Sequence, residues 1–303
     1  MKTVVFYYTQ SGQALSAVQS ICKPLAGTTG SENILIYKQI IPLQDYPFPW
    51  NSDEFFDTFP ETRLGLPPSG ISPIDLSDVE DADLVIVAGQ SWFLSPSLPL
   101  QSFFTDRQIV SYLAGRNVVF VNACRNMWLM TIRKIKDYLR AADAKLVGHI
   151  VLQDKAPNLI SAFTIVRWLL HGRKQGTGLL PDAGVRDADI TAASRFGEII
   201  LSSWRADSFS RLQEQLLSAG AICYKPSIMF MEKAGHRMFG LWAQFVRRKG
   251  SFRNPRRRWR IRLFYYYLLV VLFGISPFGQ LFFYLTYPCQ HVNRHRQEDC
   301  NID

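Results

Sequence analysis

The sequence predicts an α/β protein built on a five-stranded parallel sheet with helices on both faces. Short apolar, β-branched runs alternate with helix-like segments along the first half of the chain, and such alternation is typical of parallel strands joined by helical crossovers. The clearest run, Ala82 to Gly89, contains the unbroken apolar stretch 84–88, as expected for a strand buried on both faces. The five expected strands are residues 4–8, 33–41, 82–89, 117–121 and 145–152.

The first strand leads into a loop and a helix. The run 4–8 stops at the turn 9–13, Thr-Gln-Ser-Gly-Gln, which is rich in hydroxyls and contains a glycine. In the segment 13–25 apolar residues recur at three- and four-residue steps, which predicts a helix with one face on the sheet. Free backbone N–H groups and the helix dipole favour an anion at such a helix N-terminus.

This first loop lacks two known nucleotide-binding patterns. It has neither the lysine of a Walker loop nor Gly-x-Gly-x-x-Gly, so it does not indicate ATP or NAD. A terminal phosphate held by hydroxyls and backbone amides fits the loop better. A plain helix N-cap without a ligand is the alternative interpretation.

Between the second and third strands lies a segment that is dense in proline and aromatic residues. Its richest parts are 46–50 and 55–60. The segment is too long for an ordinary connection and too aromatic for a linker. It predicts a structured flap over a pocket or, alternatively, a small separate core.

Two further loops follow strands that should lie beside the first. Ligands of parallel sheets bind beyond the carboxyl ends of the strands, where residues 9–14, 89–97 and 122–128 would gather. Aromatic side chains in these loops suit a planar ring, and amides suit its polar edge. The candidates to flank a ring are Trp92, Phe93 and Trp128, and the amide candidates are Asn122 and Asn126.

Composition bounds the class of protein. At 303 residues the chain fits one large domain or a domain with an appendage, and 48% hydrophobic residues exclude global disorder. The cysteines are odd in number and form no Cys-x-x-Cys, and the N-terminus enters a strand without a signal peptide. These features predict a reduced, cytosolic body. Further helices are expected at 100–104, 129–141, 190–204, 209–217 and 226–246.

The net charge of +9 comes from one short segment of the chain. Nine Lys or Arg residues and no acid lie between Arg247 and Arg262, which leaves the rest of the chain neutral. This polybasic segment adjoins the uncharged run 263–287 and carries only Trp259 among its charges, so it does not indicate nucleic-acid binding.

The uncharged run is 25 residues long. That length suffices for a tilted helix across a hydrocarbon core of about 30 Å. A break at Gly274-Ile-Ser-Pro277 would instead give a re-entrant hairpin or an interfacial pair of helices, and a buried core helix is the third alternative. The adjoining cations favour an anionic membrane surface and place the body on the cytoplasmic face of the inner membrane.

Residues 1–152 resemble the flavodoxin-like family in strand order, loop placement and first-loop composition. In that family the first loop holds the phosphate of FMN with hydroxyls and backbone amides. This loop departs from the family at Ala14, where a further hydroxyl is typical. The residues that the resemblance and the three loops assign to FMN are Thr9, Gln10, Ser11, Gly12, Gln13, Ala14, Gln90, Ser91, Trp92, Phe93, Asn122, Cys124 and Trp128.

A second resemblance covers most of the chain. The strings Pro-Phe-Pro-Trp (47–50), Phe-Phe-Asp-Thr-Phe-Pro-Glu (55–61), Trp-Phe-Leu-Ser-Pro-Ser-Leu-Pro (92–99) and Ala-Cys-Arg-Asn-Met-Trp-Leu-Met (123–130) are similar to the bacterial family called dialkylresorcinol condensing enzyme. This resemblance implies an FMN-dependent oxidation that aromatises a 2,5-dialkylcyclohexane-1,3-dione, with a ketosynthase as partner. The alternative is a non-catalytic electron carrier or scaffold of a membrane lipid pathway.

Chemical roles follow for a few residues. Arg125 and Asn126 are expected to stabilise the dione as an enolate, since developing negative charge on oxygen needs fixed donors. His171 or Asp154 would take the proton. Cys124 lies beside Arg125 but has no accompanying histidine, which favours a buried structural cysteine over a condensing nucleophile.

The sequence also predicts a division into three parts: a flavodoxin-like domain (1–152), a helical substrate extension (153–246) and a membrane anchor with a polar tail (247–303). The tail contains Cys289, His291, His295 and Cys300. Their spacing matches no standard zinc module, so no metal site is predicted.

Overall fold

The computed structural model describes residues 1–26, 33–286, 299, 300 and 302. Its centre is a parallel sheet in the order β2-β1-β3-β5-β6, which is the strand order of flavodoxin-like proteins. The five predicted strands are confirmed. They are β1 (Lys2–Tyr7), β2 (Ile34–Gln39), β3 (Leu84–Trp92), β5 (Asn117–Cys124) and β6 (Lys145–Gln153), and β4 (Ser95–Pro96) turns back antiparallel along the end of β3.

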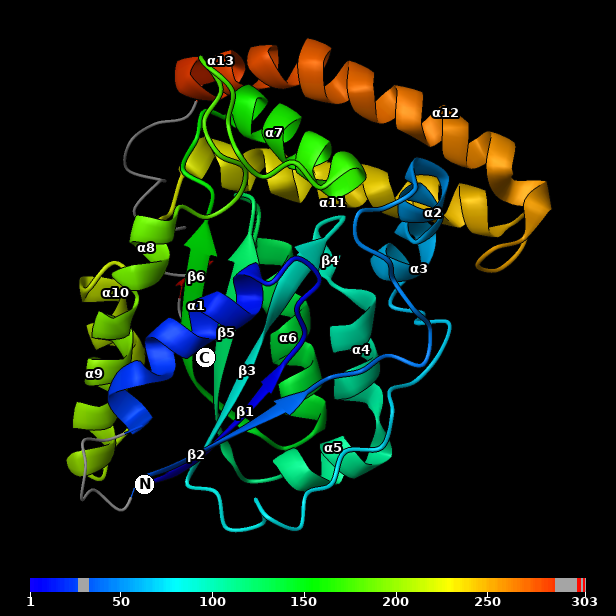
Figure 1. Cartoon of the computed structure of the whole chain (residues 1–303). Coiled ribbons are helices and arrows are strands. Elements are labelled where there is room, and N and C mark those ends of the chain that lie inside the picture. The colour runs from blue at the N-terminus through cyan, green and yellow to red at the C-terminus, as the bar shows by residue number, and fades with distance from the viewer. Residues whose placement is uncertain (27–32, 287–298, 301, 303) are drawn as a thin grey trace.

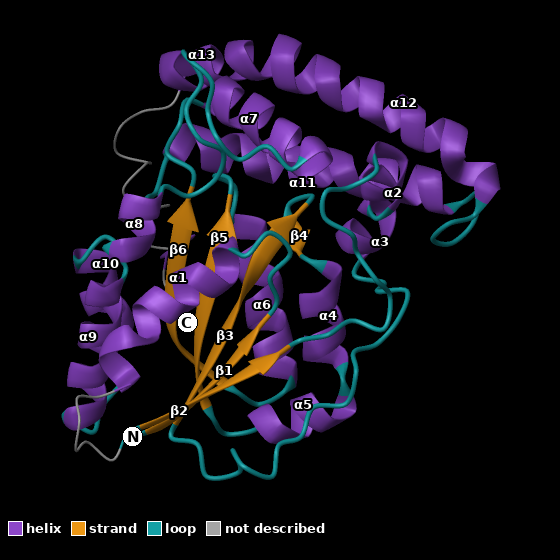
Figure 2. Cartoon of the chain, in the orientation of Figure 1, coloured by secondary structure: helices purple, strands orange, loops and turns teal. Residues whose placement is uncertain are grey.

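Helices cover both faces of the sheet, as Figures 1 and 2 show. Side chains alternate along a strand, so Val4 and Phe6 enter the core on one face and Val5 enters the core on the other. The first face carries α4 (Leu98–Thr105), α5 (Arg107–Leu113) and α6 (Leu129–Ala141). The second carries α1 (Gln13–Cys22) with η1 (Lys23–Ala26), α8 (Asp187–Thr191), α9 (Ser194–Arg205) and α10 (Leu212–Ser218).

The second face is completed by residues beyond the predicted boundary at 152. Phe196 and Ile200 of α9 pack in one core with Val18 and Ile21 of α1. Gly197 permits this close approach, because a Cβ there would lie 1.9 Å from the carbonyl oxygen of Ile21. The boundary at 152 therefore does not separate two cores.

A layer of helices, the lid, lies across the carboxyl ends of the strands (Figure 1). The lid comprises α7 (Asn158–His171), α11 (Pro226–Arg247), η2 (Pro255–Arg257), α12 (Arg258–Leu269), the π-helical η3 (Val270–Ile275) and α13 (Ser276–Thr286). Its last part holds the uncharged run, which stays helical through residues 274–277 instead of breaking there. Among the helices in the described ranges, none combines the length and the apolar character that a membrane crossing requires.

The aromatic segment is a structured flap that joins the sheet to the lid. It contains α2 (Ser52–Asp57) and α3 (Phe59–Leu64). The ring of Phe59 is fully buried, stacks on Phe264 of α12 at 3.7 Å and meets Phe239 of α11 edge-on at 5.5 Å. Helices far apart in the sequence thus share one aromatic core.

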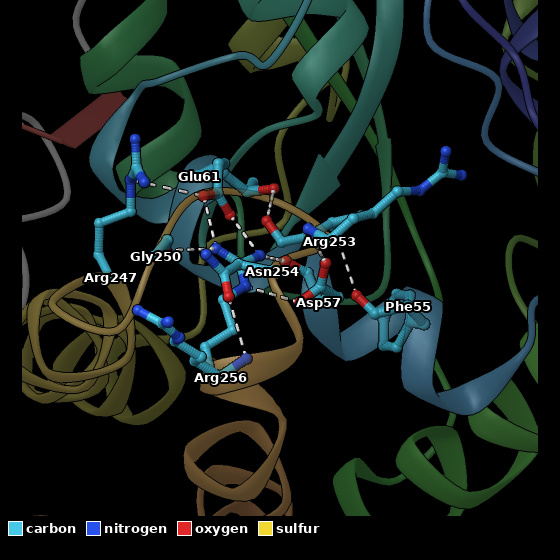
Figure 3. Close-up of polar contacts among 11 residues, drawn as sticks. Phe55, Asp57, Glu61, Arg247, Gly250, Arg253, Asn254 and Arg256 are labelled. Atoms are coloured by element: carbon cyan, nitrogen blue, oxygen red, sulfur yellow. Dashed lines mark hydrogen bonds and ion pairs between the residues drawn. The ribbon is translucent and has the colours of Figure 1, made fainter.

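One buried ion-pair cluster fixes the flap to the polybasic segment. Arg257 is fully buried; its Nε donates to Asp57 Oδ1 at 2.7 Å, and its two terminal nitrogens donate to the Glu61 carboxylate at 2.7 and 2.9 Å. Figure 3 shows the surroundings of Asp57 and Glu61, where Arg247 also approaches Glu61 at 3.5 Å. The expectation that the polybasic segment serves a membrane surface is therefore wrong for Arg257, which is fully buried.

We expect Arg257→Met to destabilise the fold by about 3 kcal/mol or more, because it removes the buried cation that pairs with both carboxylates. Urea unfolding measures the change. Arg256→Met is the matched control, since Arg256 is exposed and its side chain makes no ion pair within the described residues. Equal stability of the two variants would contradict a structural role for the cluster.

Candidate functional site

The first loop lies where the strand order reverses, between β1 and β3. Gly12 caps α1 with a left-handed φ of 84°, and no side chain caps the helix. An added Cβ at Gly12 would meet nothing within 4 Å, so the loop is open at this point. The free N–H groups of the first turn of this ten-residue helix are available to an anion.

An unpaired hydroxyl group in the loop also indicates an anion site. The hydroxyl oxygen of Thr9 is buried and has no hydrogen-bond partner among the described residues, whereas buried hydroxyls in proteins are usually paired. Ser11 is half-buried beside it. An orphaned hydroxyl, a neighbouring serine and an uncapped helix N-terminus fit a phosphate group.

Other residues assigned to the loop are engaged with the protein. Gln13 donates to the carbonyl of Val185 at 2.7 Å and accepts from its N–H at 3.1 Å, so its amide ties α1 to the segment before α8. Gln10 donates to the carbonyls of Tyr46 and Pro47, both at 3.2 Å. Ala14 is buried. These three residues shape the loop, and Gln10 brings the flap against it.

The flap and α7 close over this end of the sheet. The backbone N–H of Trp50 donates to the carbonyl of Leu169 at 2.7 Å, and Phe48 meets Trp168 edge-on at 5.8 Å. The flap therefore bridges the first loop and the lid.

The predicted aromatic sandwich is not formed. Trp92 is only 6% exposed and lies edge-on to Tyr8, Tyr46 and Trp50 at 5.3 to 6.1 Å. Phe93, at a φ of 45°, turns toward the flap and packs on Phe55 and Phe59. Both rings are held by other aromatic residues that the flap brings to them.

Trp128 is a clear correction. Its side chain is fully buried beneath the loop edge and packs against His149 at 5.6 Å and Tyr224 at 6.5 Å. A ring in that place belongs to the core between α6, β6 and α11, so Trp128 does not flank a ligand in this structure. The sequence pattern placed the loop 122–128 correctly at the end of β5. It did not show that the Trp128 side chain turns into the core.

The ends of β3 and β5 carry a small polar network. Ser91 and Asn122 exchange hydrogen bonds at 3.1 to 3.2 Å, and Thr131 donates to Ser91 at 2.8 Å. Gln90 is half-buried, and its amide points toward Gln10 at 3.5 Å. Of these residues, Gln90 and Ser91 are partly open to the site, while Asn122 is fully buried.

Arg125 and Asn126 lie at the junction of β5 with α7. Arg125 donates to the backbone carbonyl of Asn158 at 3.1 Å, and Asn126 donates to the Asn158 side chain at 2.9 Å. Burial lowers the pKa of Arg125 to about 10, which leaves the guanidinium charged at neutral pH. Within the part of the chain that the structure describes, the buried Oδ1 of Asn126 has no hydrogen-bond partner. The pair is therefore rigid and charged at the carboxyl edge.

The two candidate proton acceptors lie in different places. Asp154 is buried near Cys124, but its carboxylate accepts from Ser161 at 2.6 Å and from the N–H of Ala156 at 2.9 Å. His171 is exposed at the far end of α7, about 20 Å from Asn158 at the helical rise per residue. The prediction that His171 acts beside Arg125 is therefore wrong.

Cys124 does not have an activated thiol. Burial raises the pKa of the Cys124 thiol, and the neighbouring Glu232 adds to this effect, while Arg125 opposes it. A thiol that stays protonated is a poor nucleophile. The site thus offers no support for a condensing cysteine.

Sequence reasoning missed Glu232. It comes from α11, is fully buried, and accepts from the N–H of Met130 at 2.8 Å at the start of α6. Burial raises the pKa of the Glu232 carboxyl to about 7, against the opposing effect of the backbone N–H groups. No motif marks this residue, because only the docking of the lid brings it to α6.

Of the four potential ligands in the tail, Cys289, His291 and His295 lie outside the described residues. Cys300 is buried. Among the residues that the structure describes, no group of three or more His, Cys, Asp or Glu side chains is arranged to hold a metal ion.

The chain is similar to several solved flavodoxins and flavoproteins, at low identity. A flavodoxin from the domain Archaea shares 13% identity over 68% of this chain and 99% of that chain, with a TM-score of 0.39. A flavoprotein from Lactobacillus acidophilus, solved in complex with FMN, shares 16% over 50% of this chain and 92% of that chain, with a TM-score of 0.38. A WrbA-like flavodoxin from Agrobacterium tumefaciens shares 10% over 68% and 98%, with a TM-score of 0.38. No protein-family model and no curated protein matches the sequence.

Glu232 predicts a pH-dependent stability. A carboxyl whose pKa rises from 4.5 to about 7 on folding binds more protons in the folded state across that interval. The free energy of unfolding should therefore fall as the pH rises through this interval, by about 3 kcal/mol relative to Glu232→Gln. Urea titrations of both proteins at pH 4 and pH 8 measure the difference. Glu198→Gln, at an exposed position, is the control. If the parent and Glu232→Gln showed the same change in unfolding free energy between pH 4 and pH 8, the raised pKa of Glu232 would be contradicted.

Proposed function

We propose that the protein binds FMN at the first loop and is a flavin-dependent oxidoreductase that aromatises a long-chain 2,5-dialkylcyclohexane-1,3-dione. One observation carries the cofactor: the buried, unpaired hydroxyl of Thr9 beside the uncapped N-terminus of α1, at the switch point of a flavodoxin-like sheet. Thr9, Ser11 and the N–H groups after Gly12 would hold the phosphate. FMN would accept the hydride that the substrate loses.

The oxidation requires little from the protein beyond position and charge. The dione would lose a proton from one ring carbon to solvent water and a hydride from the neighbouring carbon to the flavin, and enolisation would then complete the aromatic ring. Arg125 supports the enolate, because a fixed cation stabilises negative charge that develops on the dione oxygen. Its guanidinium is charged and is held by the carbonyl of Asn158 at 3.1 Å. The substrate class itself rests on the resemblance of the four sequence strings.

The outer face of the lid supports a position on the cytoplasmic face of the inner membrane. Along α12 and η3, Trp259, Leu263, Tyr266, Val270 and Phe273 recur at steps of four and three residues and are 45% to 62% exposed, so they form one apolar stripe. The opposite side of α12 is the buried one, with Ile261 and Phe264. Exposed cations flank the start of the stripe at Arg256, Arg258 and Arg262.

Such a surface fits the interface of an anionic bilayer. Apolar side chains enter the boundary of headgroups and acyl chains, and cations near the surface attract anionic lipid. The stripe continues into α13 with Phe278, Leu281 and Leu285, which are 57% to 77% exposed. A dialkyl dione partitions into lipid, so a lid that rests on the membrane would place the enzyme where its substrate is concentrated.

A non-catalytic electron carrier is the second candidate. It is favoured by the engagement of Arg125 and Asn126, the two predicted substrate contacts, with Asn158 at 3.1 and 2.9 Å. A carrier or a scaffold of the same lipid pathway, with a ketosynthase as neighbour, needs no substrate site.

The cofactor is tested by Ser11→Asp, which places a carboxylate where the phosphate would lie. We expect FMN affinity to fall about 100-fold or more, since a charge-assisted contact becomes a like-charge repulsion. Quenching of flavin fluorescence during titration gives the dissociation constants. Ser111→Asp on the exposed side of α5 adds the same charge away from the loop and should bind FMN as the parent does. If the parent protein does not bind FMN, the proposed cofactor is wrong.

The same FMN-loaded protein separates enzyme from carrier. Anaerobic mixing with a dialkyl cyclohexanedione should bleach the flavin absorbance in the parent, about 100-fold more slowly in Arg125→Met. A parent whose absorbance does not bleach would favour the carrier, and an unchanged rate in the variant would remove Arg125 from the reaction.

Membrane docking is tested by co-sedimentation of the full-length protein with vesicles of phosphatidylglycerol or of phosphatidylcholine. We expect binding to the anionic vesicles, and about 100-fold weaker binding for the double variant Val270→Glu/Phe278→Glu, because two apolar side chains leave the interface. Leu179→Glu alters an apolar side chain that is fully exposed elsewhere and serves as the control. A parent that stays in the supernatant with anionic vesicles at low salt would refute docking.

A further inference from the structure

A cavity of about 490 Å³ lies on the sheet face that carries α6, away from the first loop. Its walls come from α3, α6 and α11, which are distant in the sequence. The volume is in the range of small-molecule sites. Six basic side chains line it, together with a single carboxylate, Asp137. The basic residues are Arg63, Arg133, Lys134, Lys233, His236 and Arg237.

Only part of this positive charge is neutralised. Asp299 pairs with Arg133 at 2.9 Å and with Lys233 at 3.0 Å. Lys134 and Arg237 have no carboxylate partner in the described part of the chain. The ammonium group of Lys134 instead lies 4.9 Å over the ring of Tyr138. Like charges that converge from three elements repel one another, and an anionic ligand would relieve the repulsion.

The cavity is also preorganised. The guanidinium of Arg63 donates through Nε and a terminal nitrogen to the backbone carbonyl of His236, at 3.0 and 2.8 Å, and so is fixed against α11. Burial and the nearby Arg63 and Arg133 lower the pKa of His236 to about 4, so its imidazole is neutral and a donor or acceptor at neutral pH. Because the guanidinium of Arg63 is already held in place, a contact with it costs little conformational entropy on binding.

The nearby carboxylates do not fill the cavity. The Glu232 carboxylate lies at the N-terminus of α6, where it accepts a hydrogen bond from the backbone N–H of Met130 at 2.8 Å. Asp299 demonstrates that Arg133 and Lys233 bind an oxyanion, since both contact its carboxylate, and Tyr224 adds a third donor at 3.0 Å. Lys134 and Arg237, which have no carboxylate partner in the described part of the chain, remain available to an anionic ligand.

We propose that this cavity binds a small molecule that carries a phosphate or diphosphate group. Arg237 presents a planar fork and Lys134 a point charge, the combination that phosphate oxygens favour, and Arg63 adds the N–H groups that it does not donate to His236. The neutral and apolar part of the wall, with Leu64, Ser95 and Met130, would contact the organic part of the ligand. Ser95 belongs to β4, which pairs with Trp92 at the end of β3. The ligand would therefore lie behind the strand end that borders the first loop.

The test is calorimetric titration of the full-length, FMN-loaded protein with inorganic pyrophosphate. We expect one saturable site per chain and about 100-fold weaker binding for the double variant Lys134→Gln/Arg237→Gln, which loses two charged contacts. Neither side chain makes a hydrogen bond or ion pair that holds the described fold, so the variant should fold. Arg107→Gln removes an exposed cation of α5 as the control.

The outcomes separate this cavity from the first loop. Pyrophosphate binding that survives Ser11→Asp but weakens in the double variant supports the cavity, even if FMN does not bind at all. Binding that Ser11→Asp alone abolishes, equal weakening in Arg107→Gln, or no saturable binding by the parent would each overturn the proposal. Titration with ADP and with NADPH then distinguishes a nucleotide from a dinucleotide as the natural source of the phosphate.

Discussion

The contact of Arg257 with Asp57 and Glu61 is the constraint on which the arrangement of the lid depends. Removing three charged groups from water costs several kcal/mol per group, and only well-placed hydrogen bonds offset it. Here the guanidinium contacts both carboxylates at 2.7 to 2.9 Å, and the backbone N–H of Arg253 donates to Asp57 as well. A small displacement of α12 from the flap would leave these charges unpaired. The cluster therefore defines one position of the lid, and the aromatic contacts of Phe59 with Phe239 and Phe264 fill the space beside it.

That position decides what the carboxyl edge of the sheet can do. At the phosphate end, the first loop keeps an unpaired hydroxyl and an uncapped helix N-terminus. At the opposite end, the flap brings Tyr46 and Trp50 onto Trp92 and brings Phe55 onto Phe93. The aromatic residues that suggested a ring-binding site are thus the ones that attach the flap. Arg125 and Asn126 remain at the edge, where Asn158 fixes them to the lid.

Positive charge is divided between two surfaces with different surroundings. The exposed arginines at the start of α12 border an apolar stripe on the outside of the lid. Around the cavity between α3, α6 and α11, Arg63 is held by a backbone carbonyl, and Arg133 and Lys233 are held by the buried carboxylate of Asp299. Exposed cations beside apolar side chains suit lipid headgroups, whereas cations that converge on a cavity suit a small anion.

The sequence by itself determined the sheet and the place of the first loop. Apolar runs with helical segments between them specify parallel strands, because hydrophobic periodicity and chain connectivity are local properties. The helix 129–141 was predicted with the bounds of α6 for the same reason. Tertiary structure alone decided where side chains point and which remote residues meet. Trp128 turns into the core, and His171 lies a helix length away from Arg125. Glu232 reaches α6, and Arg257 of the polybasic segment is buried against two carboxylates. Each of these placements depends on how the lid docks, and no local sequence pattern encodes that contact.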